Sequence, residues 1–179
     1  ATHIQGPDDT MDPIGTGTAT DYSRGRATYN SLIQLRDDLV PQPELAEEFS
    51  ANSDATEWSF KLRKDVTFHD GSKLTADDVV YSMNRHYGDD STSVVKSLVS
   101  GVTEWKKVGP YEVKAIVDSP YSDLAAVLGE KQFKIVKDGT TDFSLPTGTG
   151  PFKLESFQPG VRSSHVRNEN YWREGANVD

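Results

Sequence analysis

His69 and Asp70 are neighbours in the sequence, and a histidine beside a carboxylate is a pairing used in general acid–base catalysis. Catalysis by such a pair also needs a nucleophile within hydrogen-bond distance of the imidazole, and adjacency along the chain does not provide that contact. No serine occurs in the G-x-S-x-G pattern that exposes a nucleophile at a sharp turn. His69-Asp70-Gly71 is more typical of a tight turn in which glycine adopts a positive φ. The sequence therefore predicts no catalytic residues.

The remaining histidines do not form a metal-binding pattern. His3, His86 and His165 are scattered along the chain, and no pair has the spacing of metal ligands on one element. The chain has no cysteine, which excludes disulfides, thiolate metal sites and cysteine nucleophiles. We therefore expect neither a metal site nor a cofactor.

Two glycine-containing segments invite comparison with phosphate-binding loops. The segment 15–18 (GTGT) lacks the third glycine and the helix start of the dinucleotide-binding fingerprint. The segment 149–151 (TGP) lacks the lysine of the phosphate-binding loop of nucleotide hydrolases. Neither segment is expected to bind a nucleotide.

Composition and charge exclude further classes of partner. The 179 residues carry a formal net charge of −9, with 35% hydrophobic and 26% charged residues, which is an ordinary globular balance. Phosphate backbones and anionic membrane surfaces repel such a protein, so nucleic acid and membranes are not expected partners. No apolar run approaches 18 residues, so no insertion into a membrane is predicted. The length suffices for one domain or two small lobes.

The clearest local signal predicts a helix from Ala76 to about His86. Thr75 stands at the N-cap position, and Asp78 lies in the first turn, where a carboxylate favours the positive end of the helix dipole. Leu74 and Val79 can form a hydrophobic staple across the start of this helix.

Periodicity and turn residues predict the other elements. Residues at helical spacing as far as Ile33 predict an amphipathic helix that begins near Asp21, and alternation between Trp58 and Leu62 predicts a strand. The remaining expectations are a loop at 6–20, helical segments at 45–49, 91–100 and 121–128, a hairpin of 102–108 with 111–117, and strands at 152–157 and 161–167. Because strands and helices do not alternate strictly, we predict an α+β fold with a mixed sheet.

Six segments taken together resemble a known family. They are DTMDP at 9–13, PELAEEF at 43–49, WSFKLR at 58–63, VTFHDGSKLTADDVVYS at 66–82, TGTGPF at 147–152 and RNENYW at 167–172. Segments similar to these occur in the same order in family 5 of the bacterial extracellular solute-binding proteins, the group that includes the dipeptide- and oligopeptide-binding proteins. One segment alone would be weak evidence, but together they span nearly the whole chain.

The resemblance implies a periplasmic binding protein-like fold of type II, in which a hinge joins two lobes. In family terms, residues 1–31 and 138–179 belong to the core sheet of lobe I, and residues 32–137 form its smaller outer subdomain. Members of the family are much longer than this chain. The second lobe and the C-terminal segments that complete lobe I are therefore expected outside this sequence, which leaves lobe I incomplete.

The resemblance also implies a binding protein and not an enzyme. Such a protein captures a di- or oligopeptide in the cleft between its lobes and delivers it to the permease of an ABC importer. It acts as a monomer in the periplasm, or anchored by lipid outside the cytoplasmic membrane. A non-peptide solute (an opine, an oligosaccharide or a nickel chelate) is the alternative within the family, and a periplasmic hydrolase is the alternative from another class.

Two stretches carry the ligand contacts that the resemblance implies. The first follows the "LDP"-type motif and comprises Gly17, Thr18, Ala19 and Thr20, whose small size and hydroxyl groups suit close contact with a ligand backbone. The second, at about 91–95, offers Ser93 and Val94 where peptide-binding members often place an aromatic side chain. This departure leaves a pocket for large peptide side chains in doubt.

Overall fold

The computed structural model describes residues 9–15 and 17–174. Its helices are η1 (Pro13–Gly15, a 3-10 turn), α1 (Ala19–Thr28), α2 (Ala76–Asn84), η2 (Lys96–Val99, a 3-10 turn) and α3 (Leu124–Val127). Its strands are β1 (Ile33–Leu35), β2 (Pro41–Pro43), β3 (Ala46–Ala51), β4 (Glu57–Leu62), β5 (Val102–Gly109), β6 (Glu112–Val117), β7 (Phe152–Gln158) and β8 (Arg162–Arg167). The expected α+β fold is present, because helices do not alternate with strands, but the expected mixed sheet is wrong for the described residues, since all pairings of these strands are antiparallel.

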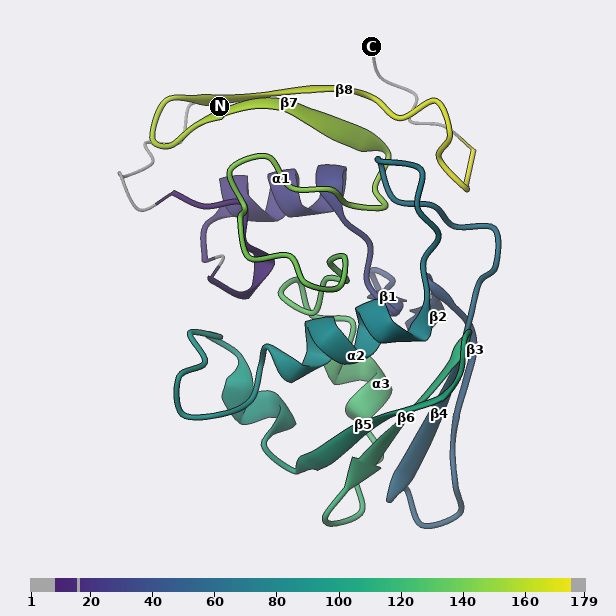
Figure 1. Cartoon of the computed structure of the whole chain (residues 1–179). Helices are drawn as coiled ribbons and strands as arrows, with labels where there is room; N and C mark the ends of the chain where they lie inside the picture. Colours follow the sequence, from purple (N-terminus) through teal and green to yellow (C-terminus); the bar gives the residue numbers. More distant parts are fainter. Residues whose placement is uncertain (1–8, 16, 175–179) are drawn as a thin grey trace.

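The largest sheet has the strand order β3-β4-β6-β5, and α2 lies across one of its faces (Figure 1). The predicted alternation in β4 is confirmed, because Trp58, Phe60 and Leu62 are buried while Lys61 is exposed. The predicted hairpin around residues 109–110 is also confirmed as β5 and β6. This sheet and α2 enclose the main hydrophobic core.

Helix α2 begins where its capping residues predict. The carboxylate of Asp78 accepts hydrogen bonds from the Thr75 N–H at 2.7 Å and from the Thr75 hydroxyl at 2.9 Å. Leu74, Val79 and Met83 are buried against the sheet. The helix ends at Asn84, slightly earlier than predicted.

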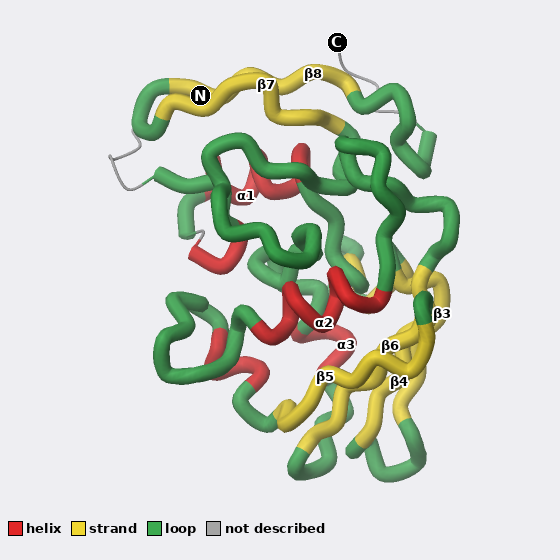
Figure 2. The backbone as a smooth tube through the Cα atoms, viewed as in Figure 1, coloured by secondary structure: helices red, strands yellow, loops and turns green. Residues whose placement is uncertain are grey.

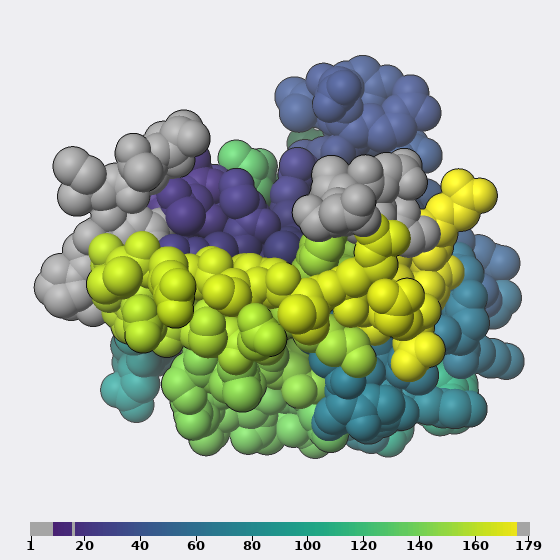
Figure 3. All heavy atoms as spheres, turned by 90° about the horizontal axis from the view of Figure 1, so that it is seen from above, coloured from purple at the N-terminus to yellow at the C-terminus, as the bar shows by residue number. Residues whose placement is uncertain are grey.

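A second layer lies above α2 in Figure 1 and consists of α1 covered by the hairpin of β7 and β8. Figure 2 shows the long loops that connect this layer to the large sheet. Viewed from above, β7 and β8 form a band across the molecule, and the turn between β1 and β2 protrudes at one side (Figure 3). The strands of this hairpin, predicted at 152–157 and 161–167, are confirmed with small shifts of their ends.

The chain passes between the two layers where residues 30–31 lie beside residues 134–135, a place called the crossing below. Ser31 pairs with Lys134 in an isolated antiparallel bridge, and the Ile135 N–H donates to the Asn30 carbonyl oxygen at 2.9 Å. The outgoing and returning segments therefore run side by side. The domain boundaries expected at residues 31 and 138 lie close to this crossing.

The helical turn expected at 45–49 is wrong. Ala46–Ala51 forms strand β3, which pairs with β4 through partners such as Phe49 and Phe60. Leucine, alanine and glutamate favour a helix locally, but the free edge of β4 offers hydrogen bonds and a buried face that a helical turn of this length would not gain.

Other expected elements are present with different bounds or are shorter than predicted. Helix α1 begins at Ala19 and ends at Thr28, so Ile33 lies in β1 and its helical spacing was coincidental. The loop expected at 6–20 contains η1 and the start of α1, and residues 6–8 and 16 lie outside the described residues. In the segments 91–100 and 121–128, only η2 and the short α3 are helical. Their local periodicity is weak, so tertiary contacts decide their conformation.

Candidate functional site

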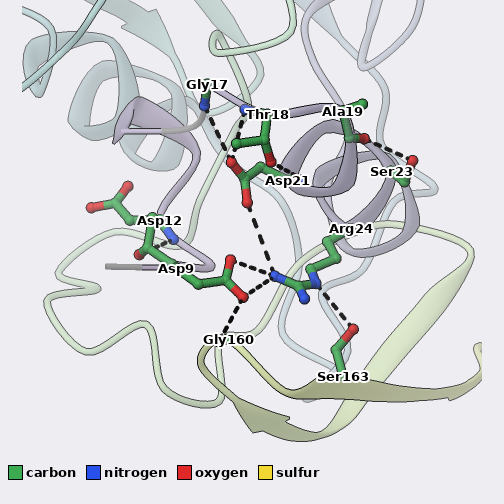
Figure 4. Close-up of polar contacts among 11 residues, drawn as sticks. Asp9, Asp12, Gly17, Thr18, Ala19, Asp21, Ser23, Arg24, Gly160 and Ser163 are labelled. Carbon is green, nitrogen blue, oxygen red and sulfur yellow. Dashed lines mark hydrogen bonds and ion pairs between the residues drawn. The ribbon is translucent and has the colours of Figure 1, made fainter. Parts of the chain in front are cut away.

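The residues 17–20, expected to contact a ligand, lie at the N-terminal end of α1 (Figure 4). Thr18 is the N-cap residue, and its hydroxyl oxygen accepts a hydrogen bond from the Asp21 N–H at 3.3 Å. The Asp21 carboxylate in turn accepts from the backbone N–H groups of Gly17 at 3.3 Å and Thr18 at 2.9 Å. This reciprocal capping fixes the backbone. Gly17, Thr18 and Ala19 are exposed, and Thr20 is half-buried.

This end of α1 offers small uncharged groups beside one fixed carboxylate. Burial alone would raise the pKa of Asp21, but hydrogen bonds from Thr18 and Gly17 hold that pKa below its usual value. The carboxylate therefore remains charged and bound to the helix end. Gly17 and Ala19 leave room for a ligand backbone, and the hydroxyls of Thr18 and Thr20 add groups that can hydrogen-bond.

The second expected stretch is joined to the loop that leads into α1. The Val94 N–H donates to the Ile14 carbonyl oxygen at 3.3 Å, which brings the two expected contact regions to one side of the molecule. Val94 is 60% exposed, whereas Ser93 is buried. The Ser93 hydroxyl points inward, 2.6 Å from Nδ1 of His86. Of these two residues, Val94 therefore presents its side chain to a solute.

The pair of His86 and Ser93 has the spacing of a catalytic base and nucleophile. Its surroundings do not suit that role. Ser93 is 7% exposed and His86 is 1% exposed, and the imidazole packs on Phe133 with ring centroids 4.6 Å apart. Burial and the nearby charge of Arg85 lower the pKa of His86 to about 4, which makes it a weak base at neutral pH. The pair holds the 91–95 segment to the core.

His86 should make the protein sensitive to acid. Because its pKa is about 4 when folded and about 6.5 when unfolded, its contribution to the free energy of unfolding is complete above pH 6.5 and is lost as pH falls towards 4. We expect a loss of at most about 3 kcal/mol from this residue. Urea unfolding at several pH values would measure it, and His86→Gln should flatten the dependence. An unchanged dependence in the variant would contradict this assignment.

The side chains of the other described histidines, His69 and His165, also contact groups within the protein. His69 Nε2 lies 3.0 Å from the Gly150 carbonyl oxygen, and His69 Nδ1 accepts from the Gly148 N–H at 3.3 Å. His165 Nε2 lies 3.5 Å from the Thr28 hydroxyl. Within residues 9–15 and 17–174, no group of three or more His, Cys, Asp or Glu side chains could hold a metal ion. In the same ranges no helix is both long and apolar enough to cross a membrane.

A cavity of about 600 Å³ lies away from these stretches, beside the crossing between the layers. Its lining includes Tyr29, Asn30, Glu44, Lys134 and Tyr171. Burial lowers the pKa of Lys134, while the buried Glu44 accepts hydrogen bonds from Asn30 Nδ2 at 2.9 Å and from a backbone N–H at 2.8 Å. Glu44 and Asn30, on the inner side of the cavity, thus hydrogen-bond to other groups of the protein.

Asn30 is an important residue that the sequence reasoning missed. It lies at the crossing, where its Nδ2 donates to Glu44 and its Oδ1 accepts hydrogen bonds from the Thr149 hydroxyl at 3.0 Å and from Trp172 Nε1 at 3.3 Å. Each of these partners belongs to one of the sequence segments that resemble the family. Those segments converge on Asn30, so part of their pattern reflects packing at the crossing and not solute contact.

Comparison with known proteins adds a family match. Residues 40–179 match the family model described as bacterial extracellular solute-binding proteins, family 5, middle. The glutathione-binding protein GsiB of Salmonella choleraesuis is 24% identical over 93% of this chain, and the dipeptide-binding protein of Escherichia coli is 27% identical over 92%. The chain spans about a third of each relative, 34% and 36% of their lengths.

A solved structure shows the same fold. The ABC transporter-associated periplasmic binding protein DppA from Helicobacter pylori, in complex with the peptide STSA, superposes with a TM-score of 0.83 over 96% of this chain and 39% of its own. The sequences are 22% identical, so this likeness concerns the fold. The expected periplasmic binding protein-like fold of type II is confirmed, as a partial domain.

Proposed function

We infer the function from the premise that this chain belongs to the bacterial extracellular solute-binding proteins of family 5. The resemblance found in six sequence segments is thereby confirmed. The relatives are solute-binding proteins and not enzymes: two are named for glutathione and dipeptide binding, and the Helicobacter pylori protein was solved in complex with a peptide. The remaining question is which solute this chain helps to bind, and where.

We propose that the whole protein binds a di- or oligopeptide between this part and a second lobe, and passes it to the permease of an ABC importer outside the cytoplasmic membrane. The carrying observation is the surface formed by Gly17–Ala19 and Val94, which is exposed, small and joined by the hydrogen bond from Val94 to Ile14. Its small side chains let an extended peptide approach closely, and the hydroxyls of Thr18 and Thr20 are groups with which the main chain of the peptide can hydrogen-bond.

The proposed division of the chain follows the crossing. We assign residues 1–31 and 138–179 to the core of lobe I and residues 32–137 to its outer subdomain. In support, β7 and β8 form a sheet that shares no strand with β3-β4-β6-β5, and the segments at Asn30 and Ile135 connect the two layers. Residues 17–20 then lie in the core part of lobe I and Val94 in the outer subdomain.

One observation favours a non-peptide solute. In the segment of about 91–95, near which peptide-binding members often place an aromatic side chain, this chain exposes Val94, and valine covers much less ligand surface. An opine, an oligosaccharide or a nickel chelate is therefore the second candidate.

A panel of solutes added to the whole protein during thermal unfolding tests this proposal. Dipeptides, longer peptides, glutathione, an opine, an oligosaccharide and a nickel chelate would each be added in excess. We expect one peptide class to stabilise the folded protein by about 2.7 kcal/mol at a hundred times its dissociation constant, and to be recovered unchanged. A shift by another class selects the alternative solute, and recovery of a chemically altered solute would establish an enzyme.

A variant of this chain links the binding to the proposed surface. Ala19→Tyr puts a bulky side chain on the exposed first turn of α1, so the stabilisation by the solute should disappear while the unfolding of the free protein changes little. Ser23→Tyr is the matched control, because Ser23 is exposed one turn further along the same helix. Equal solute stabilisation in both variants would exclude residues 17–20 from the site.

A further inference from the structure

Two adjacent residues after the C-terminal end of α2 connect the two stretches proposed to contact the solute. Arg85 donates to the Asp12 carboxylate at 2.5 Å, on the loop that leads into α1. His86 shares its 2.6 Å hydrogen bond with Ser93, next to Val94. Side chains that are neighbours in sequence thus bind segments separated by about 80 residues.

The contact of Arg85 shapes the first of these segments. One oxygen of Asp12 binds Arg85, and the other accepts a hydrogen bond from the Ile14 N–H at 3.2 Å, which sets up η1. The guanidinium group also lies 4.6 Å from the centre of the Phe143 ring. The Arg85 side chain is only 15% exposed, so solvent screens this ion pair weakly. Arg85 therefore helps to hold Asp12 where its carboxylate caps η1.

The contact of His86 shapes the second segment. Ser93, held by the imidazole, accepts a hydrogen bond from the Val95 N–H at 3.3 Å. The Ser91 hydroxyl donates to the Arg85 carbonyl oxygen at 2.7 Å, so the segment is tied to the end of α2 at two points. The imidazole ring of His86 and the Ser93 hydroxyl are both buried, and a buried hydrogen bond is costly to break.

The hydrogen bond from the Val94 N–H to the Ile14 carbonyl oxygen joins the two segments directly to each other. Helix α2 itself is anchored, since Val79 and Met83 are buried against the large sheet. A displacement of either segment must therefore break the Val94–Ile14 bond or move the other segment with it. The two segments are thus held by two contacts, Arg85 to Asp12 and His86 to Ser93, that both start from the end of one anchored helix.

We propose that Arg85 and His86 are positioning residues that couple the turn at 12–15, which precedes the proposed contact residues 17–20, to the 91–95 segment. The solute role rests on the proposed function, but the coupling itself is a property of the protein without solute. It predicts that a change at either residue loosens both segments.

Hydrogen–deuterium exchange of the whole protein without solute tests this coupling. His86→Leu removes the hydrogen bond to Ser93 and the ring contact with Phe133, neither of which involves the turn at 12–15, yet the Ile14 amide in that turn should exchange about tenfold faster relative to Val79 and Met83 in α2. Arg85→Met should likewise speed the exchange of the Val94 and Val95 amides. His86→Asn, whose amide can replace Nδ1, should restore most of the protection.

The control is Lys107→Met, which removes an exposed ion pair to Asp77 on the same helix and should leave both segments unchanged. The α2 amides report general destabilisation, and if His86→Leu does not fold, Arg85→Met carries the test. Faster exchange confined to the segment that lost its own bond would overturn the proposal, as would equal acceleration in α2. A solute panel without any response would refute the proposed function and leave this result standing.

Discussion

Replacing Arg24 with methionine is expected to lower the free energy of unfolding by about 3 to 5 kcal/mol, because the change leaves the buried Asp9 carboxylate without its partner. Arg24 Nη1 lies 2.5 and 2.7 Å from the two oxygens of Asp9, and the side chains are 9% and 1% exposed. Urea unfolding monitored by tryptophan fluorescence would measure the loss.

The large effect is expected because Arg24 connects three parts of the chain (Figure 4). It lies on α1, binds Asp9 in the N-terminal loop, and donates through Nε to the Ser163 hydroxyl on β8 at 3.1 Å. Its guanidinium group also lies 5.1 Å from the centre of the Phe157 ring on β7. Removing it weakens the attachment of the β7–β8 hairpin to α1.

Two controls separate this cost from the loss of any ion pair. Arg36→Met breaks a pair with Asp38 in which both side chains are about half exposed, so we expect a change below about 1 kcal/mol. Combining Arg24→Met with Asp9→Asn removes the unpaired charge and should recover part of the stability. Similar losses for Arg24→Met and Arg36→Met would show that burial does not strengthen the inner pair.

Replacing Gly148 with alanine is expected to cost more than about 3 kcal/mol and to separate the 147–151 loop from α1. A Cβ atom at this position would lie 1.9 Å from the Thr28 carbonyl oxygen and 2.8 Å from its carbon. Both atoms are backbone at the end of α1, so no rotation of a side chain can relieve the overlap. Circular dichroism and thermal unfolding would detect the loss.

Gly25→Ala is the matched control within the same region. Gly25 lies in the interior of α1, and an added Cβ would meet no atom within 4 Å. Alanine should therefore stabilise the helix by roughly 0.5 to 1 kcal/mol. If Gly148→Ala behaved like Gly25→Ala, the close approach of the loop to α1 would not exist in solution.

This close approach also gives the side chains of His69 and Asp70 separate partners. The His69 ring binds the Gly150 carbonyl oxygen and the Gly148 N–H, and burial lowers the pKa of His69. Asp70 binds Lys137 and the Ser72 hydroxyl, each at 2.6 Å. The two neighbouring side chains thus serve different contacts. The turn at Gly71, whose φ is 86°, places His69 where its ring binds the 147–151 loop beside the end of α1.

The sequence alone determined the features whose physical cause is local. The capping of α2 by Thr75 and Asp78, the alternation in β4 and the turn at Gly71 each depend on residues within a few positions of one another. The ordered family segments added the fold, because they record packing that many longer chains share. They also indicated residues 17–20 and 93–94, whose contact with a solute stays a prediction.

Only the tertiary structure decided the features whose partners are distant in sequence. Ala46–Ala51 became a strand because β4 offered it an edge, and α1 ended at Thr28 where the chain turns into the crossing at Asn30. The bonds from Arg85 to Asp12 and from His86 to Ser93 belong to the same class. Their strength depends on burial and exact distance, which arise only after α2 has packed on the sheet, so no local pattern in the sequence announces them.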